Sequence, residues 1–160
     1  MLKVHVWPPH DGMVGHASLS FGTDYVSFWP ADGAGKKDLK IKRSQAGHFM
    51  GALAEDISAE GGRQPLTVMI PSIDEAALSR YIAEIMSDIP QYQLARNNCS
   101  NIVASCLKVA SGRDPSFHPC AQDYGRMGRF LGRGIWTPNE VLRYARELSE
   151  PCVEAEKEIA

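Results

Sequence analysis

Alternating apolar and polar residues near the start of the chain predict an antiparallel sheet. Leu2–Trp7 alternates and is followed by two prolines. Residues 16–21 alternate again, with apolar side chains on one face and polar side chains on the other. A turn at residues 22–24 then leads into the β-rich segment Tyr25–Trp29. Residues 15–30 are therefore predicted to form a β-hairpin, which ends at a proline.

The region after the hairpin has a weaker pattern. Residues 31–37 are predicted to be a loop, and Asp38–Arg43 is predicted to be a short strand. Residues 44–63 contain four glycines, so we expect irregular structure there with one or two helical turns. The apolar run Leu66–Ile70 is stopped by a proline and predicts a further strand.

Apolar residues at helical spacing, together with capping residues, predict three helices in the second half of the chain. The first extends from Ser72, which forms a capping-box pattern with Glu75, to about Asp88. The second extends from Asn98 to Gly112. The third begins at Thr137, followed by a proline at the first helical position, and extends to about Ser149. Strands followed by helices predict an α+β fold in which an antiparallel sheet packs against helices.

Length and composition fit one domain, residues 1–150, followed by a charged tail at residues 151–160. Hydrophobic residues make up 44% of the 160 residues and charged residues 22%. A net charge of −2 with dispersed basic residues argues against a nucleic-acid binder. No apolar run approaches the roughly 20 residues of a membrane span. The first residues lack the pattern of a secretory signal, so we expect synthesis in the cytoplasm and signal-independent delivery for any action elsewhere.

Four cysteines provide one candidate nucleophile. Cys99 follows the expected N-cap residue Asn98, so unpaired backbone N–H groups and the helix dipole favour its thiolate and can stabilise an oxyanion. The alternative is that Cys99 is a small buried residue. Cys106 lies in the middle of the helix and is expected to be structural. Cys120 and Cys152 lie beside prolines, and whether they form a disulfide stays open. The sequence contains no CxxC pair, so we expect no structural zinc site.

His16 is the candidate base. It opens a predicted strand and shares a face with Ser18 and Ser20, whereas a core histidine would more often have apolar neighbours on its face. The alternative is a structural histidine. His5, on the first predicted strand, is a conceivable substitute for His16 as the base.

Two segments carry a resemblance to a known group of enzymes. GHASLSFGTDYVSFWP resembles the histidine hairpin of NlpC-type papain-like hydrolases, in which the histidine opens a strand. YQLARNNCSNIVASCLKVASG resembles the nucleophile helix of the circularly permuted members, in which histidine precedes cysteine. Those members include the lecithin:retinol acyltransferase-like proteins and the PPPDE-type deubiquitinating peptidases. The matching residues of the second segment are Tyr92, Leu94, Asn98, Cys99, Val103 and Leu107.

The resemblance implies a permuted papain-like fold and a cysteine hydrolase that requires no metal or cofactor. Cys99 would attack an acyl carbonyl, His16 would move the proton, and water would release the product. Relatives place a polar orienting residue on the strand after the histidine, a position that falls on Ser27. An even register also places Ser27 on the face of His16. Asp32, in the following loop, is the alternative orienter. Gln93 has the spacing before Cys99 that papain-like enzymes use for an oxyanion-hole glutamine.

The resemblance allows three kinds of substrate: peptide amides of peptidoglycan, protein or ubiquitin-like isopeptides, and lipid acyl esters. Relatives of the first kind include toxins injected by type VI secretion. A small, near-neutral domain favours this kind, and it implies action in the periplasm of a target cell and a cognate immunity protein as partner. A non-catalytic binding domain on the same fold is the alternative of another class, because serine is a weak orienting residue.

Overall fold

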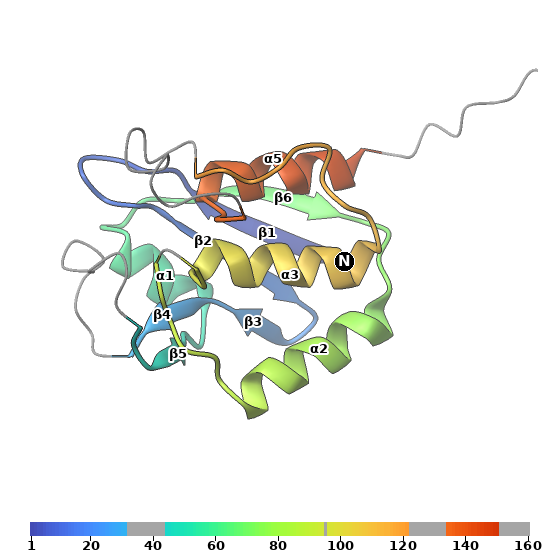
Figure 1. Cartoon of the computed structure of the whole chain (residues 1–160), viewed down its shortest axis with the longest axis horizontal. Helices are drawn as coiled ribbons and strands as arrows, with labels where there is room; N and C mark the ends of the chain where they lie inside the picture. The colour runs from blue at the N-terminus through green and yellow to red at the C-terminus, as the bar shows by residue number, and fades with distance from the viewer. Residues whose placement is uncertain (32–43, 95, 122–133, 151–160) are drawn as a thin grey trace, which may run out of the picture.

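An antiparallel sheet forms the centre of the computed structural model, which describes residues 1–31, 44–94, 96–121 and 134–150. Four strands form this sheet in the order β3-β2-β1-β6, and β4 pairs with β5 in a second, two-stranded sheet (Figure 1). The strands are β1 (Leu2–Trp7), β2 (His16–Phe21), β3 (Asp24–Val26), β4 (Phe28–Pro30), β5 (Gly47–Phe49) and β6 (Leu66–Ile70). The helices are α1 (Leu53–Ala59), α2 (Glu75–Ser87), α3 (Cys99–Ser111) and α5 (Pro138–Ser149).

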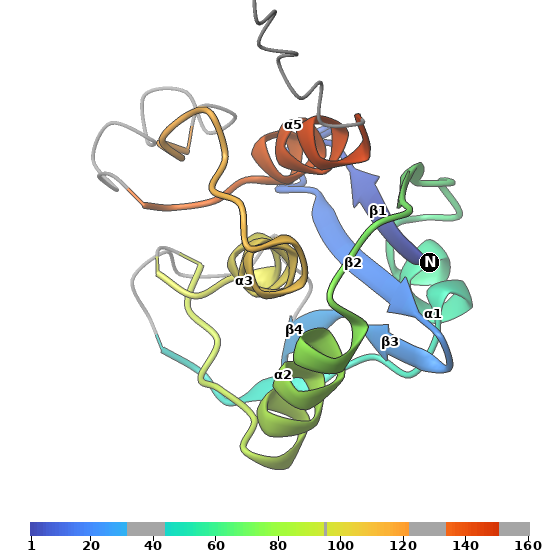
Figure 2. The ribbon, with the colours of Figure 1, turned by 90° about the vertical axis from the view of Figure 1, so that its right-hand side faces the viewer.

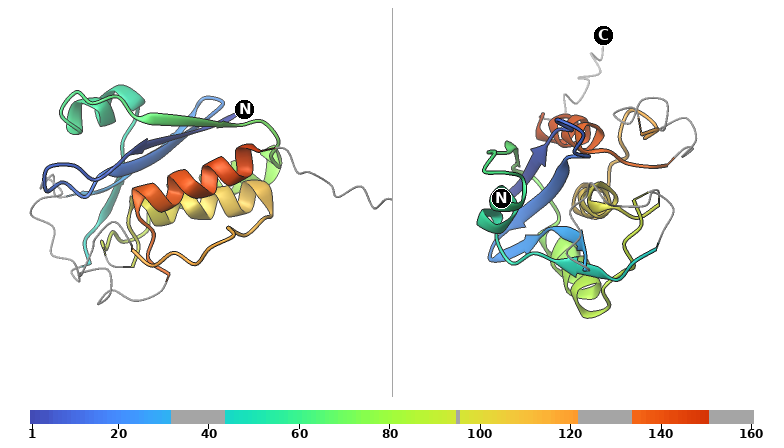
Figure 3. Two further views of the ribbon diagram at one scale, coloured as in Figure 1. Left: turned by 90° about the horizontal axis from the view of Figure 1, so that it is seen from above. Right: turned by 90° about the vertical axis from the view of Figure 1, so that its left-hand side faces the viewer.

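Helices cover both faces of the four-stranded sheet. Figures 2 and 3 show α3 and α5 on one face and α1 on the other, and α2 packs against α3. The apolar residues of the alternating strands, such as Val4 and its cross-strand partner Leu19, are fully buried in the core beneath α3 and α5. The polar residues of β2 therefore face the side of α1. Within the described ranges, no helix has the length and apolar character needed to cross a membrane.

The structure confirms the predicted α+β class, with an antiparallel sheet packed against helices. The strands predicted at Leu2–Trp7 and Leu66–Ile70 are present with those bounds. The predicted hairpin of residues 15–30 is only partly correct. Its second strand breaks at Ser27, because Phe28–Pro30 pairs with β5 and the Ser27 carbonyl accepts a hydrogen bond from Met50 N at 2.9 Å. Ser27 thus lies at the junction between the two sheets.

Two further predictions are corrected in detail. Residues 44–63 contain the expected helical turns as α1, but they also contain the strand β5, which the weak pattern did not predict. Helix α2 begins two residues later than predicted, because the side chain of Asp74, not that of Ser72, caps it. The strand predicted at residues 38–43 and the tail at residues 151–160 lie outside the described residues.

Gly15 holds the turn that delivers His16 to the sheet. Its φ is +76°, and a Cβ there would lie 2.3 Å from Trp7 O and 2.9 Å from Pro9 N. We expect Gly15→Ala to lower the free energy of unfolding by about 3 kcal/mol, because backbone strain and a steric clash add.

Gly12→Ala is the matched control for this change. Its φ is +77°, but among the described residues no heavy atom lies within 4 Å of the added Cβ. The backbone strain alone should therefore lower the free energy of unfolding of Gly12→Ala, by about 1 kcal/mol. Urea denaturation measures both variants, and equal losses would contradict the clash at Gly15.

Candidate active site

Cys99 is held at the first position of α3 by a fully engaged N-cap residue. Asn98 Oδ1 accepts a hydrogen bond from Asn101 N at 3.0 Å, and Asn101 Oδ1 accepts one from Asn98 N at 3.4 Å. The amide of Asn98 also donates to the carbonyls of Leu94 and Trp136, each at 3.0 Å. Cys99 is buried, with 4% of its surface exposed. The predicted cap is confirmed, and it places the thiol in the first turn, near the positive end of the helix dipole.

His16 is fully buried at the first position of β2, and its ring is fixed on several sides. The ring centroids of Trp7 and Trp29 lie 5.6 Å and 4.6 Å from that of His16. His16 Nε2 lies 2.8 Å from Ser27 Oγ and 3.2 Å from Asp56 Oδ2. A carboxylate accepts but cannot donate, so this contact assigns the hydrogen to Nε2. In the neutral ring Nδ1 is then the nitrogen that can accept a proton.

Asp56, on α1, is the acidic partner that the sequence analysis missed. It is fully buried, its Oδ1 accepts from Trp29 Nε1 at 2.8 Å, and its Oδ2 accepts from the hydroxyl of Tyr25 as well as from His16. Nothing in the local pattern distinguishes Asp56 from the acidic residues beside it in the sequence, such as Glu55. Its role depends on the packing of α1 onto the polar face of the sheet.

The charge of Asp56 is stabilised by its neighbours. Burial alone would raise the pKa of this carboxyl group. The hydrogen bond and positive charge of His16, with hydrogen bonds from Ser27 and Tyr25, outweigh burial and lower the pKa to about 2. The pKa of Tyr25 is raised by its own burial and then by Asp56. Around neutral pH Asp56 is therefore a carboxylate, and Tyr25 is a protonated donor.

Ser27 makes the contact with His16 that strand register predicts. Its Oγ also accepts a hydrogen bond from Trp29 Nε1 at 3.0 Å, so the hydroxyl contacts a nitrogen of each ring. The predicted choice of orienting residue, between Ser27 and Asp32, did not include Asp56, whose carboxylate places a full negative charge beside the His16 ring. Asp32 lies outside the described residues.

We expect Ser27→Ala to reduce the turnover of a Cys99-dependent reaction by about tenfold, because a neutral hydrogen bond contributes roughly 1 kcal/mol. Asp56 would still orient the ring in this variant. Steady-state kinetics on the purified variant provide the measurement. A loss greater than a thousandfold would instead make Ser27 the main orienting residue.

Gln93 lies in a tight turn that leads towards α3. Its backbone N–H donates to Asn97 O at 3.0 Å, and its carbonyl accepts from Asn97 N at 2.7 Å. The side chain of Gln93 is half-buried. Its predicted role as an oxyanion donor stays a prediction, and the backbone N–H groups in the first turn of α3 are the other candidate donors.

The elements that carry Cys99 and His16 meet at one end of the molecule. Helix α3 packs against β2 and also contacts β4, the strand that follows Ser27. Figures 1 and 3 show that α3 begins at the end of the sheet where β2 begins, and that α1 lies at this end on the opposite face. The start of α3, the start of β2 and the short helix α1, which carry a thiol, an imidazole and a carboxylate, thus lie at the same end of the sheet.

The other cysteines are different in character. Cys106 is fully buried two turns further along α3, and burial raises the pKa of its thiol to about 12. It therefore stays a neutral thiol at physiological pH. Cys152 lies outside the described residues, so the question of its pairing with Cys120 stays open.

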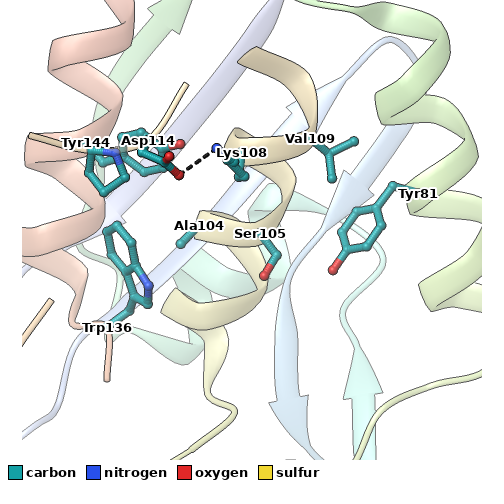
Figure 4. Close-up of a pocket in the computed structure, with 9 residues that line it drawn as sticks. Tyr81, Ala104, Ser105, Lys108, Val109, Asp114, Trp136 and Tyr144 are labelled. Atoms are coloured by element: carbon teal, nitrogen blue, oxygen red, sulfur yellow. Dashed lines mark hydrogen bonds and ion pairs between the residues drawn. The ribbon is translucent and has the colours of Figure 1, made fainter. Parts of the chain in front are cut away.

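A groove lies along the outward side of α3, and we call it the α3 groove. It has a volume of about 340 Å³. Figure 4 shows Trp136 and Tyr144 on one side of Ala104, with the ion pair of Lys108 and Asp114, at 2.6 Å, near the same rim. Because the Trp136 carbonyl accepts the hydrogen bond from the N-cap of α3, the groove adjoins the end of the helix that carries Cys99.

In the described part of the chain, no three His, Cys, Asp or Glu side chains are grouped as a metal ion would require.

Comparison with known proteins identifies the family to which the chain belongs. Neither the curated proteins nor the solved structures include a significant match. The IcsB middle domain family matches residues 40–160, a range that includes Asp56, Gln93 and Cys99 but begins after His16. Since this match covers more than half of the sequence, the chain belongs to the IcsB middle domain family.

Proposed function

We propose that this protein is a cysteine hydrolase in which Cys99 is the nucleophile, His16 is the base and Asp56 is the orienting acid. The observation that carries the proposal is the buried contact of His16 with Asp56, at 3.2 Å, at the end of the sheet where α3 presents Cys99. A fully buried carboxylate directed at one ring nitrogen fixes both the tautomer and the orientation of a histidine. This is the arrangement that a thiol nucleophile needs.

In the proposed reaction the Cys99 thiol transfers its proton to His16 Nδ1, and the thiolate attacks an acyl carbonyl carbon. The carbonyl oxygen gains the negative charge and is stabilised by N–H donors at the start of α3. The tetrahedral intermediate then expels its amine, which takes the proton from the imidazolium. Water attacks the resulting thioester, with His16 as base, and releases the acid and the free thiol. Asp56 stabilises the imidazolium in both halves of the reaction.

The same features support a permuted papain-like fold of the NlpC type. A histidine opens a strand of an antiparallel sheet, and a later helix that packs on the sheet begins with the cysteine. In this proposal Asp56 takes the place of the polar residue that such relatives have on the next strand. Ser27, which occupies that strand position, is retained as a second contact to the ring.

A peptide amide of peptidoglycan is the proposed substrate, on the strength of the sequence resemblance. With this substrate, the protein would act as a toxin that is injected into the periplasm of a target cell, and an immunity protein would neutralise it. Mass spectrometry of purified peptidoglycan after incubation with the protein tests this substrate. New amine and carboxyl termini should appear with the wild-type protein but not with Cys99→Ala. A ubiquitin conjugate in a parallel incubation tests the isopeptidase alternative.

A second candidate substrate, an apolar acyl ester, is favoured by the α3 groove. Beside the Lys108–Asp114 ion pair, its lining includes aromatic and aliphatic side chains, which adjoin the start of α3 and offer apolar surface to a hydrocarbon chain. A series of p-nitrophenyl esters of increasing chain length tests this candidate. Ser105→Trp, at an exposed position in the groove, should then slow the long esters and leave the acetyl ester unchanged. Equal effects on all esters would exclude the groove from acyl binding.

A further inference from the structure

Hydrogen bonds link two strands of the sheet to the carboxylate of Asp56. Ser18 Oγ, on β2, lies 2.9 Å from the hydroxyl of Tyr25, on β3. The hydroxyl of Tyr25 in turn contacts Asp56 Oδ2, the oxygen that His16 Nε2 also approaches at 3.2 Å. A continuous path therefore runs from Ser18 through Tyr25 and Asp56 to the ring of His16.

The direction of each hydrogen bond in this path follows from the charge of Asp56. A carboxylate can only accept, so the hydroxyl of Tyr25 must donate its single hydrogen to Oδ2. The oxygen of Tyr25 must then accept from Ser18, which donates. Hydrogen bonds that point the same way polarise and strengthen one another in a buried site. Ser18 thereby makes Tyr25 a better donor to Asp56.

Helix α1 alone offers little restraint on Asp56. It has only seven residues, and its N-cap residue, Ala52, has no polar side chain with which to cap it. Tyr25, in contrast, belongs to the sheet, where it pairs directly with Ser20 of the strand that carries His16. The hydrogen bond from Tyr25 therefore ties a carboxylate on a short helix to the same frame as the histidine that it must meet.

We propose that Tyr25, supported by Ser18, is a positioning residue that holds the Asp56 carboxylate against His16. This inference rests on the proposed function, because it assigns a role relative to the same thiol and imidazole. Trp29 holds the other oxygen, Oδ1, at 2.8 Å, so Tyr25 determines specifically how Oδ2 is presented to the ring. Tyr25 itself does not contact the reacting atoms.

The test is the pH dependence of the rate at which iodoacetamide alkylates Cys99, followed by mass spectrometry of the Cys99 peptide. Without the hydroxyl of Tyr25, Oδ2 of Asp56 is no longer held towards the His16 ring, so the carboxylate supports the imidazolium less well. In Tyr25→Phe the acidic limb of the rate profile should therefore move to higher pH by roughly one unit. Ser18→Ala should move it in the same direction by less. Unfolding curves of both variants confirm that the fold is retained.

Two controls separate positioning from a general structural effect. Ser20→Ala is matched to Ser18→Ala, because Ser20 lies on the same strand and face but its hydroxyl contacts His5 Nε2, at 2.9 Å, and not the hydroxyl of Tyr25. It should leave the profile unchanged. In an Asp56→Asn background, Tyr25→Phe should produce no further shift, because the residue on which it acts is gone.

The outcomes also separate this inference from the proposed function. If the reactivity of Cys99 depends on His16 and Asp56 but Tyr25→Phe leaves the acidic limb in place, the positioning role is wrong and the proposed function stands. The positioning role is also wrong if Tyr25→Phe shifts the limb equally in the Asp56→Asn background. If His16→Ala leaves the profile of Cys99 unchanged, the proposed function itself fails.

Discussion

Replacement of Cys99 by alanine is expected to abolish turnover, with a loss of about 10⁵-fold or more. The thiolate forms the covalent bond to the acyl carbon in the proposed reaction, and no other described cysteine has a comparable position. Cys99 is small and lies at the first turn of α3, so the free energy of unfolding should fall by only about 1 kcal/mol. Steady-state kinetics on the substrate identified by mass spectrometry, together with urea denaturation, measure both quantities.

Cys106→Ala is the matched control on the same helix. Cys106 is fully buried in the core, so its truncation leaves a small cavity and should cost about 1–2 kcal/mol of stability. Turnover should remain close to that of the wild-type protein. Loss of turnover in Cys106→Ala, with turnover retained in Cys99→Ala, would show that the nucleophile has been assigned to the wrong cysteine.

Asp56→Asn is expected to lower turnover by about 10³- to 10⁴-fold. The amide has nearly the shape of the carboxylate but carries no charge, so it stabilises the imidazolium poorly and can present its NH₂ group to the ring. Because His16 is then held in the wrong tautomer for part of the time, the loss should appear in kcat more than in KM. A loss of tenfold or less would contradict the assignment of Asp56 as the orienting acid.

The same substitution should change how stability depends on pH. The pKa of Asp56 is about 2 in the folded protein, below its ordinary value of 3.8. A depressed carboxyl pKa gives stability that is fully present above the unfolded value and is lost as the pH falls towards the folded value. The wild-type protein should therefore lose about 2 kcal/mol between roughly pH 5 and pH 2 through this group. Asp56→Asn should lack that component in acid denaturation measured by circular dichroism.

Much of the fold could be predicted from the sequence because the signals were local. The alternation of Leu2–Trp7 predicted the first strand with its bounds, and Asn98 and Thr137 cap α3 and α5 as predicted. The split at Ser27 could not be predicted, since it depends on the pairing of Trp29 with His48, a partner in a segment with little pattern of its own.

In the candidate site, too, residues with a local signal could be predicted and a residue that depends on tertiary packing could not. Cys99 and Ser27 could be chosen from the resemblance of two short segments, supported by capping chemistry and strand register, which are local properties. Asp56 could not, because its significance arises only when α1 packs on the polar face of β2 and buries the carboxylate against His16. The unusually polar face of β2 was the one available sign that buried partners were needed, and it did not indicate where in the sequence they lay.

The most direct test of the central claim is the rate at which iodoacetamide alkylates Cys99 as a function of pH, in the wild-type protein and in His16→Ala. The shapes of the two pH profiles are compared, and not the absolute rates, because truncation of the buried His16 ring also changes access to the buried thiol. We predict a wild-type rate that stays nearly constant from about pH 8 down to about pH 6. In His16→Ala the rate should instead fall about tenfold per pH unit below an ordinary thiol pKa of about 8.5. Two identical profiles, both with the ordinary thiol pKa, would contradict the assignment of His16 as the base that activates Cys99.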